Sequence, residues 1–279
     1  MNRSCYFVLA LIFILSSCTQ IDCQVNKIMT YNIKYDNPQD SINNWNNRKK
    51  EMVELFKYYG PDIFGIQEGQ LHQLSYISDH LPEYSMIGVG RDDGKKKGEF
   101  SSIYYNHEKF ELEKESTFWL SETSDVPSMG WDAAYKRVCT YGLFKDKNTN
   151  QRFFVFNTHF DHVGVTAREN SADLIIKKIK EINVDNLPVV LMGDFNSEPD
   201  DAPIKTILKD LTDGSTLAPD GIYGPHGTFT GFKENIIPEN RIDFIFIKGF
   251  NVTKYRHIDD RQKNNNYISD HLPVLIDFK

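Results

Sequence analysis

The chain has 279 residues, a formal net charge of −7 and a hydrophobic fraction of 40%. This length allows one large domain or two small ones, and the composition is ordinary for a globular protein. A dedicated, non-specific nucleic-acid binder usually carries a basic face, and no basic cluster here is longer than Lys95–Lys97. The acidic balance therefore counts against such a binder, without excluding a cleft that has local basic residues.

The N-terminus has the pattern of an export signal. Arg3 precedes the apolar stretch Tyr6–Leu15, and small residues follow it. A basic start, a short apolar core and small residues at the end are typical of a signal peptide, and this core is too short to span a bilayer. We predict a signal peptide over residues 1–17 and an exported protein, either periplasmic or at the cell surface.

The end of this signal resembles the lipobox of bacterial lipoproteins. In the order Leu15-Ser16-Ser17-Cys18, the cysteine becomes the lipidated first residue of the mature chain. We predict lipidation of Cys18, attachment to a membrane through this anchor, and a short tether over residues 18–24. An ordinary cleaved signal with an incidental cysteine is the alternative.

Two further cysteines, Cys23 and Cys139, remain in the mature chain. Cys139 sits in an apolar, strand-like stretch and is expected to be a packed thiol. A bridge between the two is allowed in an oxidising compartment, but two cysteines do not make a disulfide framework.

Residues 25–279 have the pattern of one domain that contains both strands and helices. The strand-like runs are Val25–Tyr31, Asp62–Gln67, Tyr84–Val89, Ser101–Tyr105, Val138–Phe144, Arg152–Asn157, Pro188–Met192, Asp243–Lys248 and Pro273–Phe278. Helical patterns cover Trp45–Tyr59, Gln70–Leu81, Thr166–Ile182 and Ala202–Lys209. Thr166 and Glu169 fit a capping box at the start of the third helix. Because strands and helices both alternate and cluster, we predict two sheets packed face to face with helices outside.

Polar clusters stand at or near one end of six of these strands. They are Thr30-Tyr31-Asn32, Gln67-Glu68, Thr158-His159, Gly193-Asp194-Phe195-Asn196, Asp243 and Ser269-Asp270-His271. Each cluster alone has a structural explanation, such as an Asx turn, a core histidine or a loop hydrogen-bond pair. Six such coincidences in one chain are much less expected than one.

The segment Gly193–Ser197 is the most informative of the six. It follows an apolar run, and in an extended segment residues two apart point the same way, so Asp194 and Asn196 are expected to share one face. A carboxylate beside a carboxamide can orient a water molecule and hold the oxyanion that it attacks. A strand that ends in an Asx turn is the alternative.

In this order, the six clusters resemble the endonuclease/exonuclease/phosphatase superfamily. Deoxyribonuclease I, apurinic endonucleases, bacterial sphingomyelinases and inositol polyphosphate 5-phosphatases share its fold. The resemblance covers residues 25–279. It implies an α/β fold, a four-layer α/β/β/α sandwich of two packed mixed β-sheets flanked by helices, with the site at one rim.

The resemblance also implies a metal and a base. Glu68 would bind the principal Mg²⁺ or Mn²⁺, and Asn32 and Asp270 would complete or orient its ligand shell. Asp194 would accept a proton from the attacking water, while Asn196 positions the water and the phosphoryl group.

Three further roles follow from the same resemblance. His271, oriented by a carboxylate, would hydrogen-bond the phosphoryl oxygen as charge builds on it. His159 would sit on the leaving-group side, and Asp243 would support the histidine or the metal environment.

Three basic residues are candidates for substrate binding. Arg137 precedes a strand near the place where family nucleases put a phosphate-contacting side chain, and its planar fork suits phosphate. A surface arginine beside a strand is the alternative. His162 and Arg168 follow His159 closely and are predicted to line the same cleft, although Asp161-His162 could equally be a loop pair.

We therefore expect a divalent-metal-dependent hydrolase of phosphate esters, a phosphodiesterase or phosphomonoesterase, acting by in-line attack of water activated by Asp194. The acidic balance favours a phosphorylated small molecule such as a phosphosugar, or a lipid headgroup. An exported nuclease acting on nucleic acid is the alternative, and a catalytically silent binding lipoprotein is a more distant one. No obligate protein partner is expected.

Overall fold

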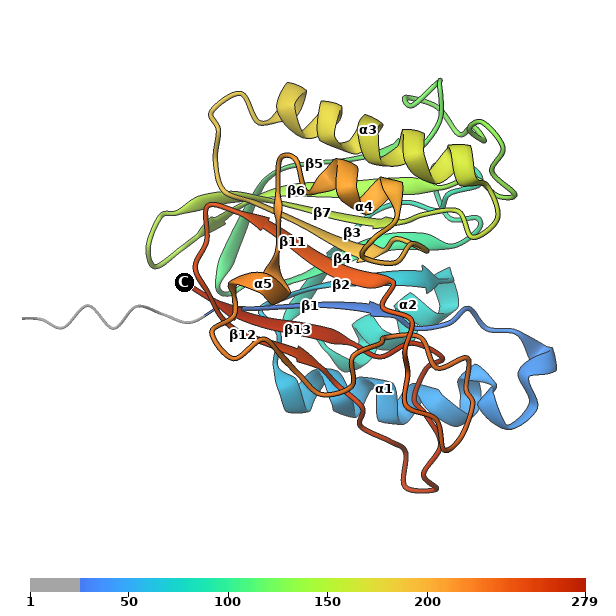
Figure 1. The fold of residues 1–279 in the computed structure, drawn as a ribbon. Coiled ribbons are helices and arrows are strands. Elements are labelled where there is room, and N and C mark those ends of the chain that lie inside the picture. The colour runs from blue at the N-terminus through green and yellow to red at the C-terminus, as the bar shows by residue number, and fades with distance from the viewer. Residues whose placement is uncertain (1–25) are drawn as a thin grey trace, which may run out of the picture.

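Two β-sheets pack face to face at the centre of the molecule, and helices cover the outer face of each sheet (Figure 1). The computed structural model describes residues 26–279. The predicted signal peptide, the lipidation site Cys18 and the tether lie outside the described residues.

The first sheet is mixed and has seven strands in the order β10-β12-β13-β1-β2-β4-β3. β1 runs parallel to β2 and antiparallel to β13. The bounds are β1 Asn26–Asn32, β2 Ile63–Gly69, β3 Tyr84–Ile87, β4 Phe100–Asn106, β10 Ile222–Tyr223, β12 Val252–His257 and β13 Val274–Phe278.

The second sheet is also mixed and has six strands in the order β5-β6-β7-β8-β11-β9. β7 runs parallel to β8, and β8 pairs with β11 in the antiparallel direction. The bounds are β5 Phe110–Trp119, β6 Val138–Asp146, β7 Arg152–His159, β8 Val189–Asp194, β9 Thr212–Asp213 and β11 Asp243–Lys248.

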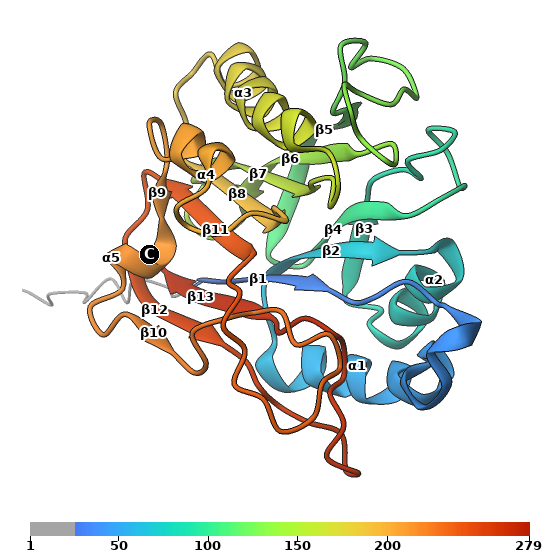
Figure 2. The ribbon, with the colours of Figure 1, turned by 45° about the vertical axis from the view of Figure 1, so that its right-hand side comes forward.

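The longer helices form the two outer layers (Figures 1 and 2). α1 and α2 lie on the first sheet, whereas α3 and α4 lie on the second. The bounds are α1 Trp45–Tyr59, α2 Leu71–His80, α3 Val165–Ile182, α4 Ala202–Ile207, the short α5 Gly214–Leu217 and a 3₁₀ segment over Pro38–Asn43. Within residues 26–279, no helix is long and apolar enough to cross a membrane.

Three apolar clusters fill the spaces between these layers. Met29 of β1 packs with Met52 and Phe56 of α1, and Leu191 of β8 packs with Ile175 of α3. The third cluster lies between the sheets and includes Ile28, Ile63, Val155, Val190, Ile245 and Ile276. Burial of these apolar surfaces is the main favourable contribution to folding. The predicted four-layer sandwich is confirmed.

Four strands were not predicted, namely β5, β12 and the two-residue strands β9 and β10, and one helix begins differently from its prediction. β5 and β12 carry charged residues on their exposed faces, which weakens their strand pattern. The predicted capping box of Thr166 and Glu169 is wrong, because α3 begins at Val165 after Gly164. Asp132, from a distant loop, instead accepts hydrogen bonds from the backbone N–H groups of Thr166 and Ala167, at 3.3 and 2.7 Å.

Candidate active site

The strand faces that carry the apolar core between the sheets also carry the side chains of the site at their ends. Ile28 of β1, Val155 of β7, Val190 of β8 and Ile245 of β11 all point into the space between the sheets. Side chains two or four residues away point the same way. Continuing each series to the strand end places Asn32, His159, Asp194 and Asp243 in the same space.

These four strand ends meet at one rim. Asp194 is the register partner of both His159 on β7 and Asp243 on β11, so three functional side chains come from neighbouring strands. Asn32 reaches across from the other sheet, and its side-chain nitrogen lies 2.9 Å from Asp194 Oδ2. The site is therefore assembled from both sheets.

Glu68 does not follow the alternation. Phe64 and Ile66 of β2 face the helices, so a regular strand would turn Glu68 away from the site. The β2–β4 register shifts between Ile66 and Gly69, and Glu68 has a φ of 62°. A bulge of this kind re-aims a side chain, and a positive φ in a non-glycine residue marks local strain of the sort found at functional sites. As a result, the Glu68 carboxylate accepts hydrogen bonds from Asn32 Nδ2 at 3.0 Å and from the Tyr35 N–H at 3.1 Å.

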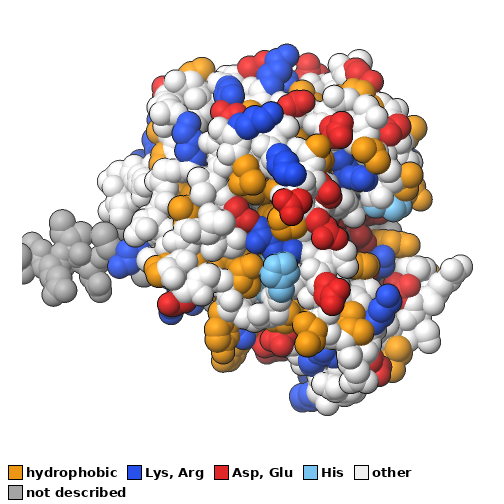
Figure 3. Space-filling view, in the orientation of Figure 1, with side chains coloured by type: hydrophobic (Ala, Val, Ile, Leu, Met, Phe, Trp, Pro, Cys, Tyr) orange, Lys and Arg blue, Asp and Glu red, His pale blue; other side chains and the backbone are white. Residues whose placement is uncertain are grey.

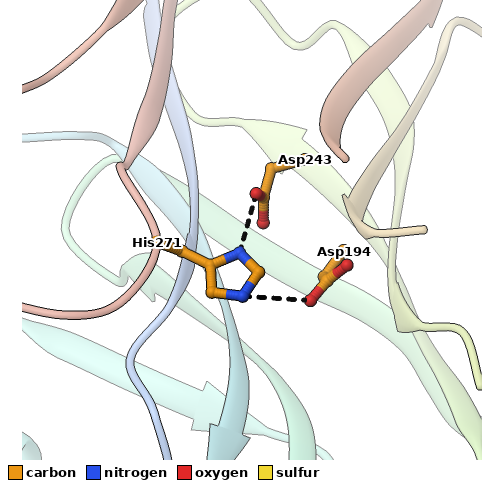
Figure 4. Close-up of side chains that lie close together, drawn as sticks. All are labelled: Asp194, Asp243 and His271. Carbon is orange, nitrogen blue, oxygen red and sulfur yellow. Dashed lines mark hydrogen bonds and ion pairs between the residues drawn. The ribbon is translucent and has the colours of Figure 1, made fainter. Parts of the chain in front are cut away.

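Three buried groups form a line at the centre of the site (Figure 4). His271 Nδ1 lies 2.9 Å from Asp243 Oδ2, and His271 Nε2 lies 3.7 Å from Asp194 Oδ2. Although burial alone would lower the pKa of His271, Asp243 and Asp194 raise it to about 10. The ring is therefore an imidazolium at neutral pH. Burial also raises the pKa of Asp194 above its usual value.

The segment after β8 bends sharply at the site. β8 ends at Asp194, and Asn196 has a φ of 45°, so the two side chains do not share the face of one strand as predicted. Asn196 N–H donates to Asp194 Oδ1 at 2.9 Å, which is the Asx turn of the alternative interpretation. Gly193 is needed here, since its φ is 148° and a Cβ would lie 2.1 Å from the Thr158 carbonyl oxygen.

His159 packs against the two residues of this turn. Its Nε2 lies 3.1 Å from Asn196 Nδ2 and 3.4 Å from Asp194 Oδ2. Burial, together with the cations of Arg137 and Arg91, holds the pKa of His159 well below its usual value, so the ring is neutral. Its predicted place on the leaving-group side stays a prediction, because its contacts are with the residues predicted to handle the water.

Two carboxylates and an ammonium form the other end of the site. Lys34 Nζ lies 3.8 Å from Glu68 Oε2 and 3.5 Å from Asp270 Oδ2. Burial would raise the pKa of Glu68, but Lys34 and then His271 outweigh it and lower that pKa. Burial raises the pKa of Asp270 above its usual value. The charge of His271 opposes this shift, and the charge of Glu68 adds to it.

All of these groups except Asn32 and Asp243 line one cavity of about 610 Å³. Of the predicted substrate-binding residues, Arg137 and His162 line it, whereas Arg168 does not. The cavity also contains residues that the sequence did not single out, namely Lys34, Tyr35, Gln70, Arg91, Asp92, Gly98, Glu99, Tyr135, Phe229 and Ile242. These come from loops, and only the structure brings them together.

Arg137 lines the cavity, and neighbouring side chains hold its guanidinium in place. Its Nε lies 3.3 Å from Asp161 Oδ2, its Nη2 lies 3.1 Å from His162 Nδ1, and its buried Nη1 has no partner within the described chain. Asp161 and His162 thus both hold Arg137 in place, and of these two residues His162 lines the cavity and Asp161 does not. Arg168 donates to the Asp161 carbonyl at 3.0 Å and therefore supports this loop from outside the cavity.

Two groups of side chains have donor atoms that suit a divalent cation. Asp194, Asp243 and His271 place one ligand atom each within 4.8 Å of one another, but both ring nitrogens of His271 face carboxylates. Glu68 and Asp270 present oxygen atoms to the cavity, and the Lys34 ammonium already supplies positive charge beside them. Hard oxygen ligands of this kind fit Mg²⁺ or Mn²⁺.

Comparison with known proteins agrees with this geometry. The model of the Endonuclease/Exonuclease/phosphatase family matches residues 29–271, from the first strand to the last histidine of the site. The chain belongs to this family. Its members are phosphoesterases and nucleases, so the predicted family and the predicted class of hydrolase agree with the match.

Two solved structures from Bacteroides are similar over nearly the whole chain. A mannosyl-6-phosphatase of Bacteroides thetaiotaomicron is 40% identical, with a TM-score of 0.87, and the match covers 91% of this chain and 99% of that one. An endonuclease/exonuclease/phosphatase of Bacteroides vulgatus is 41% identical, with a TM-score of 0.86 and coverage of 92% and 99%.

A probable RNA exonuclease of Saccharomyces cerevisiae is a more distant relative. It is 29% identical over 205 residues, which is 66% of this chain but only 40% of the yeast protein. The family thus includes relatives described as acting on sugar phosphate and on RNA.

Proposed function

We propose that the protein is a divalent-metal-dependent phosphomonoesterase whose substrate is a phosphorylated sugar. The observation that carries the proposal is the convergence of Asp194, Asn196 and the His271 imidazolium in one solvent-accessible cavity. A carboxylate that can take a proton stands beside donors that can hold phosphoryl oxygens. The similarity to a mannosyl-6-phosphatase supports the choice of a sugar phosphate.

The chemistry assigned to these residues is hydrolysis with one water molecule. The water oxygen forms a bond to phosphorus as the ester P–O bond breaks, and Asp194 accepts the proton that the water loses. The sugar oxygen leaves and is protonated by solvent, so the products are the free sugar and inorganic phosphate. A cation held by Glu68 and Asp270 would neutralise charge on the phosphoryl oxygens.

The other residues position the reacting groups. Asp243 holds the His271 ring and keeps it charged, so that its Nε2–H can donate to a phosphoryl oxygen. Asn32 donates to both Glu68 and Asp194, which makes an orienting role the one that its contacts support. Arg137, which lines the cavity, is a candidate phosphate clamp.

A nuclease is the second candidate, favoured by the similarity to the yeast protein described as a probable RNA exonuclease. Two observations weigh against it. On the face seen in Figure 3, acidic and basic side chains are interspersed rather than gathered in a basic stripe. In addition, the Glu99 carboxylate lines the cavity, where a nucleic-acid strand would bring further phosphates.

Hydrolysis rates with matched substrates distinguish these candidates. We expect the purified protein with Mg²⁺ or Mn²⁺ to release phosphate from mannose 6-phosphate and to leave bis-(p-nitrophenyl) phosphate and single-stranded RNA almost untouched. EDTA should abolish the reaction. Cleavage of RNA or of the diester at a higher rate than the sugar phosphate would favour the nuclease, and no cleavage of any of them would favour a silent binding protein.

We also propose that the protein is exported and anchored by a lipid on Cys18, on the basis of the Leu15-Ser16-Ser17-Cys18 pattern. Labelling with a radioactive fatty acid in a bacterial host should mark the wild-type protein and not Cys18→Ser. Equal labelling of both, or of neither, would contradict the anchor.

A further inference from the structure

A buried ion pair lies in the cavity wall and has no part in the proposed reaction. Arg91 and Glu99 form a bidentate salt bridge, in which Arg91 Nη1 donates to Glu99 Oε2 at 2.7 Å and Nη2 donates to Oε1 at 2.9 Å. The two side chains are 11% and 17% exposed, and both line the cavity. A buried pair of this kind contributes little stability compared with well-packed apolar side chains. Stability alone therefore gives a weak reason for placing charges there.

The pair is held rigidly. Arg91 N–H donates to the Glu99 carbonyl at 3.0 Å, so the two residues face each other across a hairpin-like loop. Trp119 Nε1 donates to the Arg91 carbonyl at 2.8 Å, and Lys136 Nζ donates to the Asp92 carbonyl at 2.8 Å. These bonds tie the loop to the end of β5 and to the segment that follows it, which lies beside the loop in Figures 1 and 2. A site held in this way is preorganised for a ligand.

The pair also leaves hydrogen-bonding capacity unused. Arg91 Nε is buried and has no partner among residues 26–279. Each Glu99 oxygen accepts one bond from Arg91 and has a second acceptor site. Because Arg91 Nε is buried, the unused capacity that a ligand in the cavity can reach is that of the Glu99 oxygens, which suit the hydroxyl donors of a sugar.

Two aromatic rings extend the same wall. Tyr135 stacks on His162 with ring centroids 5.8 Å apart and an angle of 16°, and the Arg91 guanidinium lies 5.2 Å from the Tyr135 centroid. Because His162 Nδ1 faces Arg137 Nη2 at 3.1 Å, it must accept, and Nε2 carries the ring proton. The wall thus offers one more donor and an apolar ring that is 53% exposed.

We propose that Arg91, Glu99, Tyr135 and His162 form the subsite for the polyhydroxyl part of the substrate. This inference rests on the proposed function, since it places the sugar that leaves when phosphate is released. Glu99 would accept bonds from sugar hydroxyls, and the ring of Tyr135 would cover an apolar face of the sugar. The same carboxylate disfavours a second phosphate, which makes the subsite selective for a neutral sugar.

Kinetics with two monoesters test the subsite. For Glu99→Gln we expect KM for mannose 6-phosphate to rise about 10-fold, with kcat within about twofold. The values for p-nitrophenyl phosphate, whose leaving group lacks sugar hydroxyls, should change by less than about twofold. Glu113→Gln is the matched control, because Glu113 of β5 accepts a hydrogen bond from Arg152 Nε of β7 at 2.7 Å, away from the cavity. Equal losses on both substrates, or no change on either, would overturn the subsite.

A binding measurement separates this inference from the proposed function. In the Asp194→Asn background with Mg²⁺, calorimetric titration with mannose 6-phosphate should show about 10-fold weaker binding when Glu99→Gln is added, while inorganic phosphate binds unchanged. If mannose 6-phosphate binds in this way but wild type does not hydrolyse it, the proposed function fails and the subsite stands. If hydrolysis occurs but Glu99→Gln leaves sugar-phosphate binding unchanged, or weakens phosphate equally, the subsite is wrong.

Discussion

Asp194 is the side chain through which most of the proposed site is connected. It accepts hydrogen bonds from Asn32 Nδ2 and Asn196 N–H, and the rings of His159 and His271 approach its Oδ2 to 3.4 and 3.7 Å. Replacing it with Asn keeps the size of the side chain but removes the proton acceptor. We expect Asp194→Asn to lower kcat by about 10²–10⁴-fold with an unchanged fold, measured by phosphate release and by circular dichroism. A loss of less than tenfold would remove Asp194 as the base.

The pH dependence of the rate reports on the same group. Burial raises the pKa of Asp194 to about 7, and the base works only when ionised. The rate should therefore fall as the pH decreases through this range, and a bound cation, by favouring the carboxylate, moves the fall to lower pH. We expect the acid limb of kcat/KM at or below pH 7 in Mg²⁺. An optimum below about pH 5 would contradict this role.

At the residue scale, the sequence predicts the side chains that lie at or within a few residues of strand ends, and it misses most of those that lie farther out on loops. Asp194 and Asp243 could be found because each follows or begins an apolar run. Arg91 and Glu99 could not, since their pairing depends on how a polar loop folds back on itself. Arg168 was predicted to line the cleft from proximity in sequence alone, and α3 carries it outside the cavity.

At the scale of elements, α3 depends on a residue that lies far away in the sequence. Asp132 accepts hydrogen bonds from two backbone N–H groups in the first turn of α3, whereas Glu169 accepts no such bond. We expect Asp132→Ala to lower the free energy of unfolding by about 1 kcal/mol and Glu169→Ala to change it by less than about 0.5 kcal/mol, measured by urea denaturation. Equal effects would restore the capping box that the sequence suggested.

Most strands and helices could be predicted, because their apolar residues recur with period 2 or 3.6. β5 was not predicted, because it lies at the edge of its sheet and exposes charged residues such as Glu111 and Glu115, which interrupt the apolar pattern of a strand. The bulge in β2 was equally hidden, although it decides the direction of Glu68. The bulge is a shift in the pairing of β2 with β4, so the order of apolar and polar residues along β2 alone does not predict it.

At the scale of the whole molecule, the site joins the two sheets, so ligands that bind it should stabilise the fold. A cation present at 100 times its Kd contributes about 2.7 kcal/mol, which for a chain of this size raises Tm by on the order of 5–10 °C. We expect Mn²⁺ to raise Tm in wild type and in Asp243→Asn, and not in Glu68→Gln, measured by calorimetry. The reverse pattern would place the cation at Asp194, Asp243 and His271 instead.

The most direct test of the proposed function is the rate of phosphate release from mannose 6-phosphate. We expect wild type to turn over this substrate with Mg²⁺ or Mn²⁺, and both EDTA and Asp194→Asn to reduce the rate by at least about 100-fold. A rate that survives either change would contradict the proposed metal-dependent reaction at this site.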